Sequence, residues 1–183
     1  TLAAVLTQNG VRAVSRGYSH ASINDADVAV EYDGSVRGES RYHGIRWFPI
    51  EIKTRILNGP TDWETVVPKT LEIARYMGAR VNRSCGHHIH VDFPEFKDKL
   101  SVARSLVNIA YKYQRVIAQL VPPSRRENGY CRPMPQRALK ILHGCQTREC
   151  YRRALSGWER QTWLNLNHLF GAEPRFAVRL HGG

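Results

Sequence analysis

Apolar residues recur along the chain with two periods, which predict helices in some segments and strands in others. Between residues 100 and 120 they return every three or four positions, as on one face of an α-helix. Between residues 28 and 32 β-branched side chains alternate instead, which is typical of a strand, and Asp33-Gly34-Ser35 then predicts a tight turn. The segment at 45–52 is the expected hairpin partner of this strand.

The same patterns extend along the whole chain. They predict helices at residues 2–9, 61–77, 100–120, 135–142 and 147–155. They predict strands at residues 11–14, 28–32, 45–52, 79–82, 87–92, 163–169 and 176–180. Strands separated by helices or hairpins indicate a mixed α+β fold. A length of 183 residues suits a single domain over residues 1–183, with a helical insertion over residues 132–157.

Candidate chemistry concentrates on the strand predicted at residues 87–92, which reads His-His-Ile-His-Val-Asp. Because side chains alternate along a strand, His88, His90 and Asp92 share one face. Buried imidazoles need hydrogen-bond partners, so three histidines in four residues are unusual as packing residues. This face suits a metal ion with a bound phosphate, whereas His87 on the other face fits a structural role.

Glu51 is a second candidate because it stands between two isoleucines on a predicted strand. A carboxylate among apolar neighbours is costly unless it is paired or bound to a metal. Lys53 points to the same face and offers an ion pair. The segment alone leaves a metal ligand and an ion pair equally open.

The formal net charge of +11 favours an anionic partner, such as a nucleotide, a phosphate or a nucleic acid. Between residues 124 and 160, nine cationic and three acidic side chains give +6. Arg125 and Arg126 follow a predicted helix there, and Arg179 stands in an apolar strand; guanidinium groups suit polyphosphates. A solvated basic surface, a phosphate pocket and a nucleic-acid face stay open as alternatives.

Cysteine usage and hydropathy bear on the cellular setting. The four cysteines carry no mark of secretion, so we expect reduced thiols and a cytoplasmic location. Cys145 and Cys150 are more widely spaced than the ligands of a usual zinc knuckle, although His143 makes a zinc site conceivable, and metal binding by Cys131 is equally open. Residues 1–10 lack the features of a signal peptide, and no run approaches the roughly 20 apolar residues of a membrane span.

Several segments, taken in order and spacing, also carry a family likeness. They are Gly34-Ser35, Ile50-Glu51, Asn58-Gly59-Pro60, Arg80-Val81-Asn82, and the segments at 84–92, 124–131, 164–167 and 178–183. Together they resemble the amidoligase family of glutamine synthetase-like carboxylate–amine ligases. The likeness covers nearly the whole chain, and its Cys-Gly-His-His-Ile-His segment at 85–90 is fairly specific.

The resemblance implies a glutamine synthetase-like fold, in which a curved, mainly antiparallel sheet holds ATP and Mg²⁺ or Mn²⁺ on its concave face. It implies ATP-dependent ligation of a carboxylate to an amine or ammonia through an acyl phosphate. The expected partners are small-molecule or peptide carboxylates and amines, with no membrane partner. Self-association through exposed sheet edges is also an expectation.

The resemblance also implies roles for single residues. His88 would be a metal ligand, and His90 would contact ATP phosphate or ribose. Glu51 would be a metal ligand or an amine-side carboxylate. Arg179 would hold phosphate, and Arg125 and Arg126, which match an arginine loop that follows a helix, would bind the cofactor. Glu51, Arg126 and Arg179 would be the catalytic residues.

Two departures from the family pattern bear on activity. Family members open with a strand carrying Glu-x-Glu, and the printed sequence starts after that position, so we expect a fold incomplete at its N-terminus. The last strand of the family reads Glu-x-Arg, where this chain has Ala177-Val178-Arg179. The alternative functions are therefore a catalytically inactive relative that binds a nucleotide or a partner protein and, less favoured, a basic nucleic-acid-binding metalloprotein.

Overall fold

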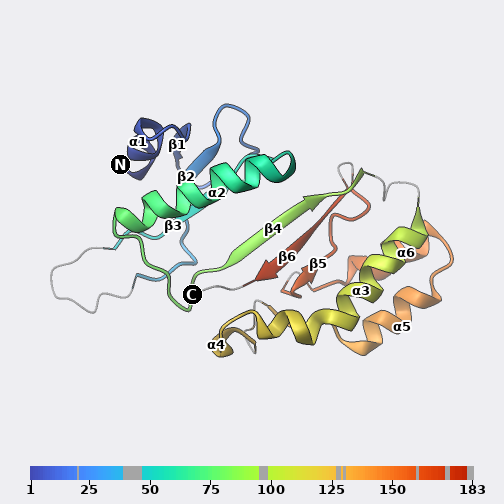
Figure 1. Cartoon of the computed structure of the whole chain (residues 1–183). Coiled ribbons are helices and arrows are strands. Elements are labelled where there is room, and N and C mark those ends of the chain that lie inside the picture. Colours follow the sequence, from blue (N-terminus) through green and yellow to red (C-terminus); the bar gives the residue numbers. More distant parts are fainter. Residues whose placement is uncertain are drawn as a thin grey trace. The chain divides into compact units, whose positions relative to one another are not determined.

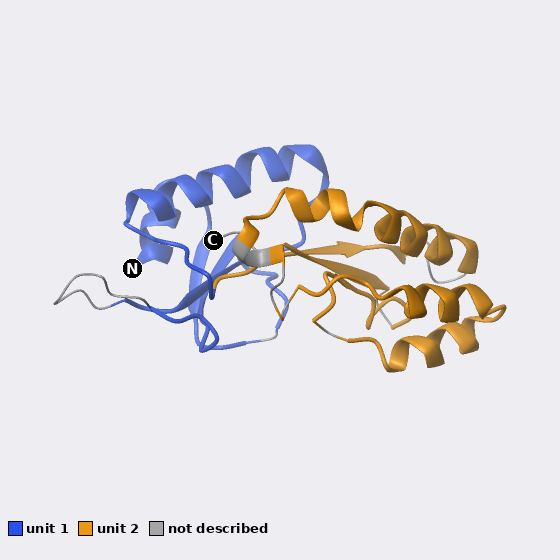
Figure 2. Cartoon of the chain, turned by 90° about the horizontal axis from the view of Figure 1, so that it is seen from below, with its two compact units in different colours: residues 1–84 blue, residues 85–183 orange. Residues whose placement is uncertain are grey.

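The structure is a computed structural model that describes residues 1–19, 21–38, 47–94, 99–126, 129, 131–159, 161–171 and 174–180. It is a mixed α+β protein, as the sequence predicts. The chain divides into two compact units, Thr1–Ser84 and Cys85–Gly183 (Figure 2). Each unit has its own three-stranded sheet and its own apolar core. The single domain expected over residues 1–183 stays a prediction.

Unit 1 combines a small sheet with two helices (Figure 1). Its elements are α1 (Leu2–Gln8), β1 (Ala13–Arg16), β2 (Val28–Tyr32), β3 (Ile50–Thr54) and α2 (Gly59–Tyr76). The strand order is β1-β2-β3, with β1 parallel and β3 antiparallel to the central strand. Strand β2 has the predicted bounds.

Alternation along β2 gives the sheet of unit 1 an apolar face and a polar face. Val28 and Val30 are buried and pack with Leu6 of α1 and with partly buried side chains of α2. Ala29 and Glu31 face the other way; Ala29 is buried in a second apolar cluster, and Glu31 is only 2% exposed. The helices therefore cover one side of the sheet, and the other side carries a small apolar cluster and a buried carboxylate.

Unit 2 holds a second sheet whose strand order is β4-β6-β5, with both pairings antiparallel (Figure 1). Its strands are β4 (His87–Asp92), β5 (Leu164–Asn165) and β6 (Arg175–Leu180). Over the two described sheets, three of the four pairings are antiparallel, which agrees with the mainly antiparallel character that we expect.

Helices supply most of the core of unit 2. They are α3 (Leu100–Gln119), α4 (Pro123–Arg126), α5 (Gln136–Gly144) and α6 (Arg148–Ser156). Val107, Leu142 and Tyr151 are each no more than 1% exposed and belong to one apolar cluster. Phe176 and Val178 of β6 pack against this cluster, so one face of the sheet meets the helices and the alternate face carries the polar residues.

Local turns remove one predicted strand and shorten another, and the strand predicted at 11–14 is found at Ala13–Arg16. Residues 79–82 form no strand: the Asn82 side chain donates to the carbonyl of Arg37 (2.7 Å) and accepts from the amide of Ser84 (2.8 Å). The strand predicted at 163–169 is limited to Leu164–Asn165, because the Asn165 side chain accepts the amide of Asn167 (3.0 Å) and turns the chain. In both places a local asparagine turn replaces a ladder of backbone hydrogen bonds.

The strand predicted at 45–52 is also shorter in the structure, because β3 begins at Ile50. Pro49 immediately before it has no N–H to donate to a ladder. Residues 45 and 46 of this prediction lie outside the described part of the chain.

Candidate functional site

The antiparallel register of β4 and β6 assembles the candidate site of unit 2. Directly opposite residues share a face of a sheet, and here His88 lies opposite Arg179 while His90 lies opposite Ala177. Atom Nη1 of Arg179 lies 3.3 Å from Nε2 of His88. A guanidinium can only donate, so the imidazole accepts through Nε2 and carries its proton on Nδ1. Two of the predicted site residues are therefore in contact.

Asp92 and Arg175 form the next opposed pair on the same face. Although the His90 side chain remains more than a third exposed, partial burial lowers its pKa below the usual value of 6.5. The positive charges of Arg175 and Arg179 lower that pKa further, and Asp92 opposes them. His90 is thus a neutral imidazole near pH 7 beside two guanidinium groups, an environment that favours an anion.

Arg126 and Arg179 both line a small pocket of about 40 Å³. The aromatic ring of Trp163 and the thiol of Cys131 also line it. Nε of Arg126 donates to the carbonyl of Val121 (3.3 Å), and Sγ of Cys131 donates to the carbonyl of Arg179 (2.9 Å). A volume of this size holds only about three water molecules. The pocket suits a small chemical group, such as one phosphate.

Glu51 lies on β3 of unit 1, directly opposite Glu31 of β2. The ammonium of Lys53, which the sequence offers as a partner for Glu51, contacts Oε2 of Glu31 at 2.5 Å. Lys53 also donates to the carbonyl of Ser19 (2.6 Å), whose amide donates to Glu31 (3.2 Å). The buried carboxylate that pairs with Lys53 in this sheet is therefore that of Glu31.

Sequence reasoning overlooked Glu31, although a signal was present. It is the only charged residue of β2, a strand that otherwise reads Val-Ala-Val and Tyr. An acid at that place in a buried strand needs a partner, and Lys53 lies on the same face, diagonal to it.

These side chains supply only some of the ligands that a divalent metal needs. Mg²⁺ prefers carboxylate and other oxygen ligands, whereas His88 directs its Nε2 lone pair at Arg179 and Asp92 lies opposite Arg175. Within the described residues, no group of three or more His, Cys, Asp or Glu side chains gathers at metal-binding distance. The polar face of unit 2 therefore fits a phosphate better than a bare divalent cation.

Within unit 2, the structure brings several of the predicted site residues together. His88, His90 and Arg179 share one face of one sheet, and Arg126 meets Arg179 at the small pocket. Glu51 belongs to the other unit. The side chain of Arg125 lies outside the described part of the chain. The catalytic, cofactor and metal roles of all six residues stay predictions.

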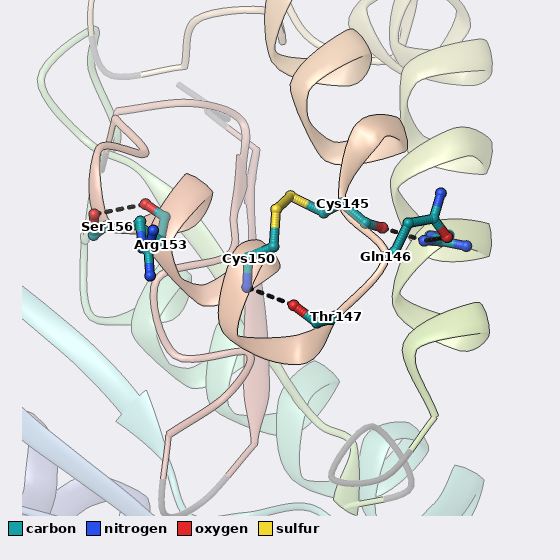
Figure 3. The surroundings of a disulfide bond; sticks show 7 residues. Cys145, Gln146, Thr147, Cys150, Arg153 and Ser156 are labelled. Atoms are coloured by element: carbon teal, nitrogen blue, oxygen red, sulfur yellow. Dashed lines mark hydrogen bonds between the residues drawn. A yellow bond between two sulfur atoms is a disulfide. The ribbon is translucent and has the colours of Figure 1, made fainter.

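The expectation of reduced thiols is wrong for Cys145 and Cys150, which form a disulfide (Figure 3). The turn between α5 and α6 brings their Cα atoms to 5.3 Å, and the hydroxyl of Thr147 accepts the amide of Cys150 (3.1 Å) to begin α6. The zinc alternative fails at this pair because both sulfurs are used. Nε2 of His143 lies 2.5 Å from Oδ1 of Asn108.

Two further expectations concern membranes and the cellular compartment. None of the helices in the described part of the chain is both long and apolar enough to cross a membrane. Disulfides are uncommon in reducing compartments, and the cytoplasmic location stays a prediction.

Comparison with known proteins identifies the family of the chain. The family model described as "Putative amidoligase enzyme" matches residues 1–183, so the chain belongs to the amidoligase family. The resemblance in its motifs is thereby confirmed. No curated protein and no solved structure was found to match it.

Proposed function

We propose that the protein is an ATP-dependent ligase that joins a carboxylate to an amine or ammonia. A carboxylate oxygen attacks the γ-phosphorus of ATP, and the bond to the β-phosphate oxygen breaks to release ADP. The amine nitrogen then attacks the acyl carbon, the bond to the phosphate oxygen breaks, and phosphate and a proton leave. Family membership supports the reaction class, and the mainly antiparallel pairing agrees with a glutamine synthetase-like fold.

The observation that carries this proposal is the set of donors on one face of β4 and β6. Arg175 and Arg179 lie on this face with His88 and His90, and their guanidinium groups donate along fixed directions. Donors held in place before the reaction stabilise charge that develops on a phosphoryl group without reorganising. In this proposal Arg179 and His90 contact phosphate oxygens, and Arg126, with Arg125, completes the phosphate side.

A divalent ion such as Mg²⁺ or Mn²⁺ would neutralise part of the charge on the phosphates. The polar face of unit 2 does not fit such an ion by itself. The metal roles of His88 and Glu51 therefore stay proposals that rest on the family likeness alone.

The test is turnover of ATP with magnesium chloride and a panel of carboxylates paired with amines or ammonium. Phosphate release and the mass of the ligated product are both measured. Arg179→Gln should reduce turnover by about 100-fold, because it removes a charged donor to the transferring group. Arg115→Gln on an exposed position of α3 is the matched control and should leave turnover unchanged. Unchanged ATP across the panel would count against a ligase.

One observation favours a second candidate, a relative that binds nucleotide without turnover. Ala177 lies opposite His90, where the family pattern has a glutamate. Calorimetry with ATP separates the two functions, since heat of binding without phosphate release supports the second. Ala177→Glu should then restore turnover if the missing carboxylate is the cause. Ala177 is only 6% exposed, so circular dichroism must first show that this variant folds.

A further inference from the structure

A groove of about 650 Å³ lies in unit 2 between α5, the end of α6 and the residues that join them to the sheet. Its walls include Ala138 and Ile141 of α5, spaced one helical turn apart, together with Ala154 and Trp158. The volume falls in the range of specific ligand sites, which are mainly apolar with a few placed polar groups. Ile141 is 57% exposed, so a large apolar side chain stands open to a partner here.

Contacts with neighbouring residues hold the helices and the Trp158 ring that form the walls of the groove. The Cys145–Cys150 disulfide ties the end of α5 to the start of α6 (Figure 3). Arg104 of α3 donates to the carbonyl of Cys145. Nε1 of Trp158 donates to the carbonyl of Leu164 at 2.9 Å, which fixes the indole ring against the sheet. Walls that are already ordered lose little conformational entropy when a ligand binds.

The charge of this region defines the kind of ligand. Between residues 132 and 159 the sequence has six cationic and two acidic side chains, a net charge of +4. Two of the cations, Arg132 and Arg137, line the groove together with one acid, Glu159, so the lining itself carries a net charge of +1. Arg132 also contacts Glu159 at 3.1 Å, but both side chains are more than half exposed, so the pair is weak and open to exchange with another carboxylate.

We propose that this groove binds a short acidic peptide segment that carries a large apolar side chain. The apolar side chain lies against Ile141 and Trp158, and flanking carboxylates contact Arg137 and Arg132. A nucleic acid fits less well, because the lining is mainly apolar and offers two cations rather than a track of them. The inference concerns binding alone, and it holds whether or not the protein proves to be a ligase.

The test is fluorescence polarisation with a fluorescein-labelled hexapeptide of sequence EDLFED and the unmodified protein. Saturable binding that weakens as salt rises is expected. Two altered peptides divide the contributions: KKLFKK reverses the charges, and EDSSED removes the apolar side chains. Each should bind at least about tenfold more weakly, since each loses one of the two kinds of contact.

Paired variants locate the site. Ile141→Glu should weaken EDLFED binding by about tenfold or more, whereas Ile109→Glu on α3, at a position equally exposed (58%), should not. Arg137→Glu and Arg115→Glu form a second pair with the same change of net charge. The proposal would be overturned if both variants of either pair bound EDLFED equally well. It would also be overturned if a fluorescein-labelled oligonucleotide bound more tightly than EDLFED, or if binding did not saturate at millimolar peptide.

Discussion

Each of the two sheets has charged side chains on one face, but the sheets differ in how these charges are paired. In unit 1, Glu31 is balanced by Lys53 at 2.5 Å, and Arg16 is balanced by Asp25. In unit 2, the contact across the strands joins Arg179 to the imidazole of His88, and the neighbouring His90 has a lowered pKa. Pairs of opposite charge neutralise each other within the fold, whereas two arginines on one face with a single acid, Asp92, give a net positive face suited to an anion.

The units also differ in how their loops are held. Arg55 of unit 1 donates to Asp27 (3.0 Å) and Asp62 (2.7 Å), and its hydrogen bond lowers the pKa of Asp62 to about 2. Burial alone would raise the pKa of Asp27, but hydrogen bonds from Arg12 and Arg55 lower it. Unit 2 uses a covalent bond between Cys145 and Cys150 instead. Unit 1 should therefore respond to salt and acid, and unit 2 to reducing agents.

The largest effect should come from breaking the charge balance of unit 1. Lys53→Met removes the cation and leaves the Glu31 carboxylate buried, which should lower the free energy of unfolding by about 3 kcal/mol. Urea unfolding followed by circular dichroism measures this change.

The double variant Glu31→Leu/Lys53→Met separates charge from packing. It replaces both partners by apolar side chains and should restore most of the lost stability. If the single and double variants are equally unstable, the Glu31–Lys53 pair is not the source of the effect.

An intermediate effect is expected from the disulfide of unit 2. Cys145→Ala/Cys150→Ala opens a short loop and should lower the free energy of unfolding by about 2 kcal/mol. Excess dithiothreitol should shift the urea midpoint of the wild type to that of the variant and leave the variant unchanged. A wild-type midpoint that ignores dithiothreitol would show that the two thiols are not bridged in solution.

Regular alternation made much of this fold predictable. Strands β2 and β4 have the expected bounds because each has a clear period of two, and α3 ends within one residue of its expected end. Asn82 and Asn165 misled the prediction, since a side chain that bonds to nearby backbone competes with strand pairing. Such competition depends on local geometry that apolar periodicity does not record.

The candidate site was predictable to the extent that it lies within one strand. The shared face of His88 and His90 follows from alternation alone. The register that places His88 opposite Arg179 depends on how two distant segments align. The ion pair between Lys53 and Glu31 depends on a diagonal contact between neighbouring strands. The disulfide needed the turn between α5 and α6, which composition does not reveal.

The smallest effect, and the most direct probe of the cationic face, concerns the titration of His90. Arg175→Gln should raise the pKa of His90 toward 6.5, because it removes a positive charge that disfavours the imidazolium. NMR of the imidazole resonances against pH measures the midpoint, and Arg115→Gln should leave it unchanged. With a folded pKa below 6.5, the unfolded chain binds the proton first as pH falls. His90 therefore has no effect on stability well above pH 6.5, lowers stability progressively as pH falls from 6.5 to its folded pKa, and keeps the full cost below that pKa. A wild-type midpoint at or above 6.5 would mean that the arginines do not act on this face as a cationic set, and the contrast between the two sheets would lose its basis.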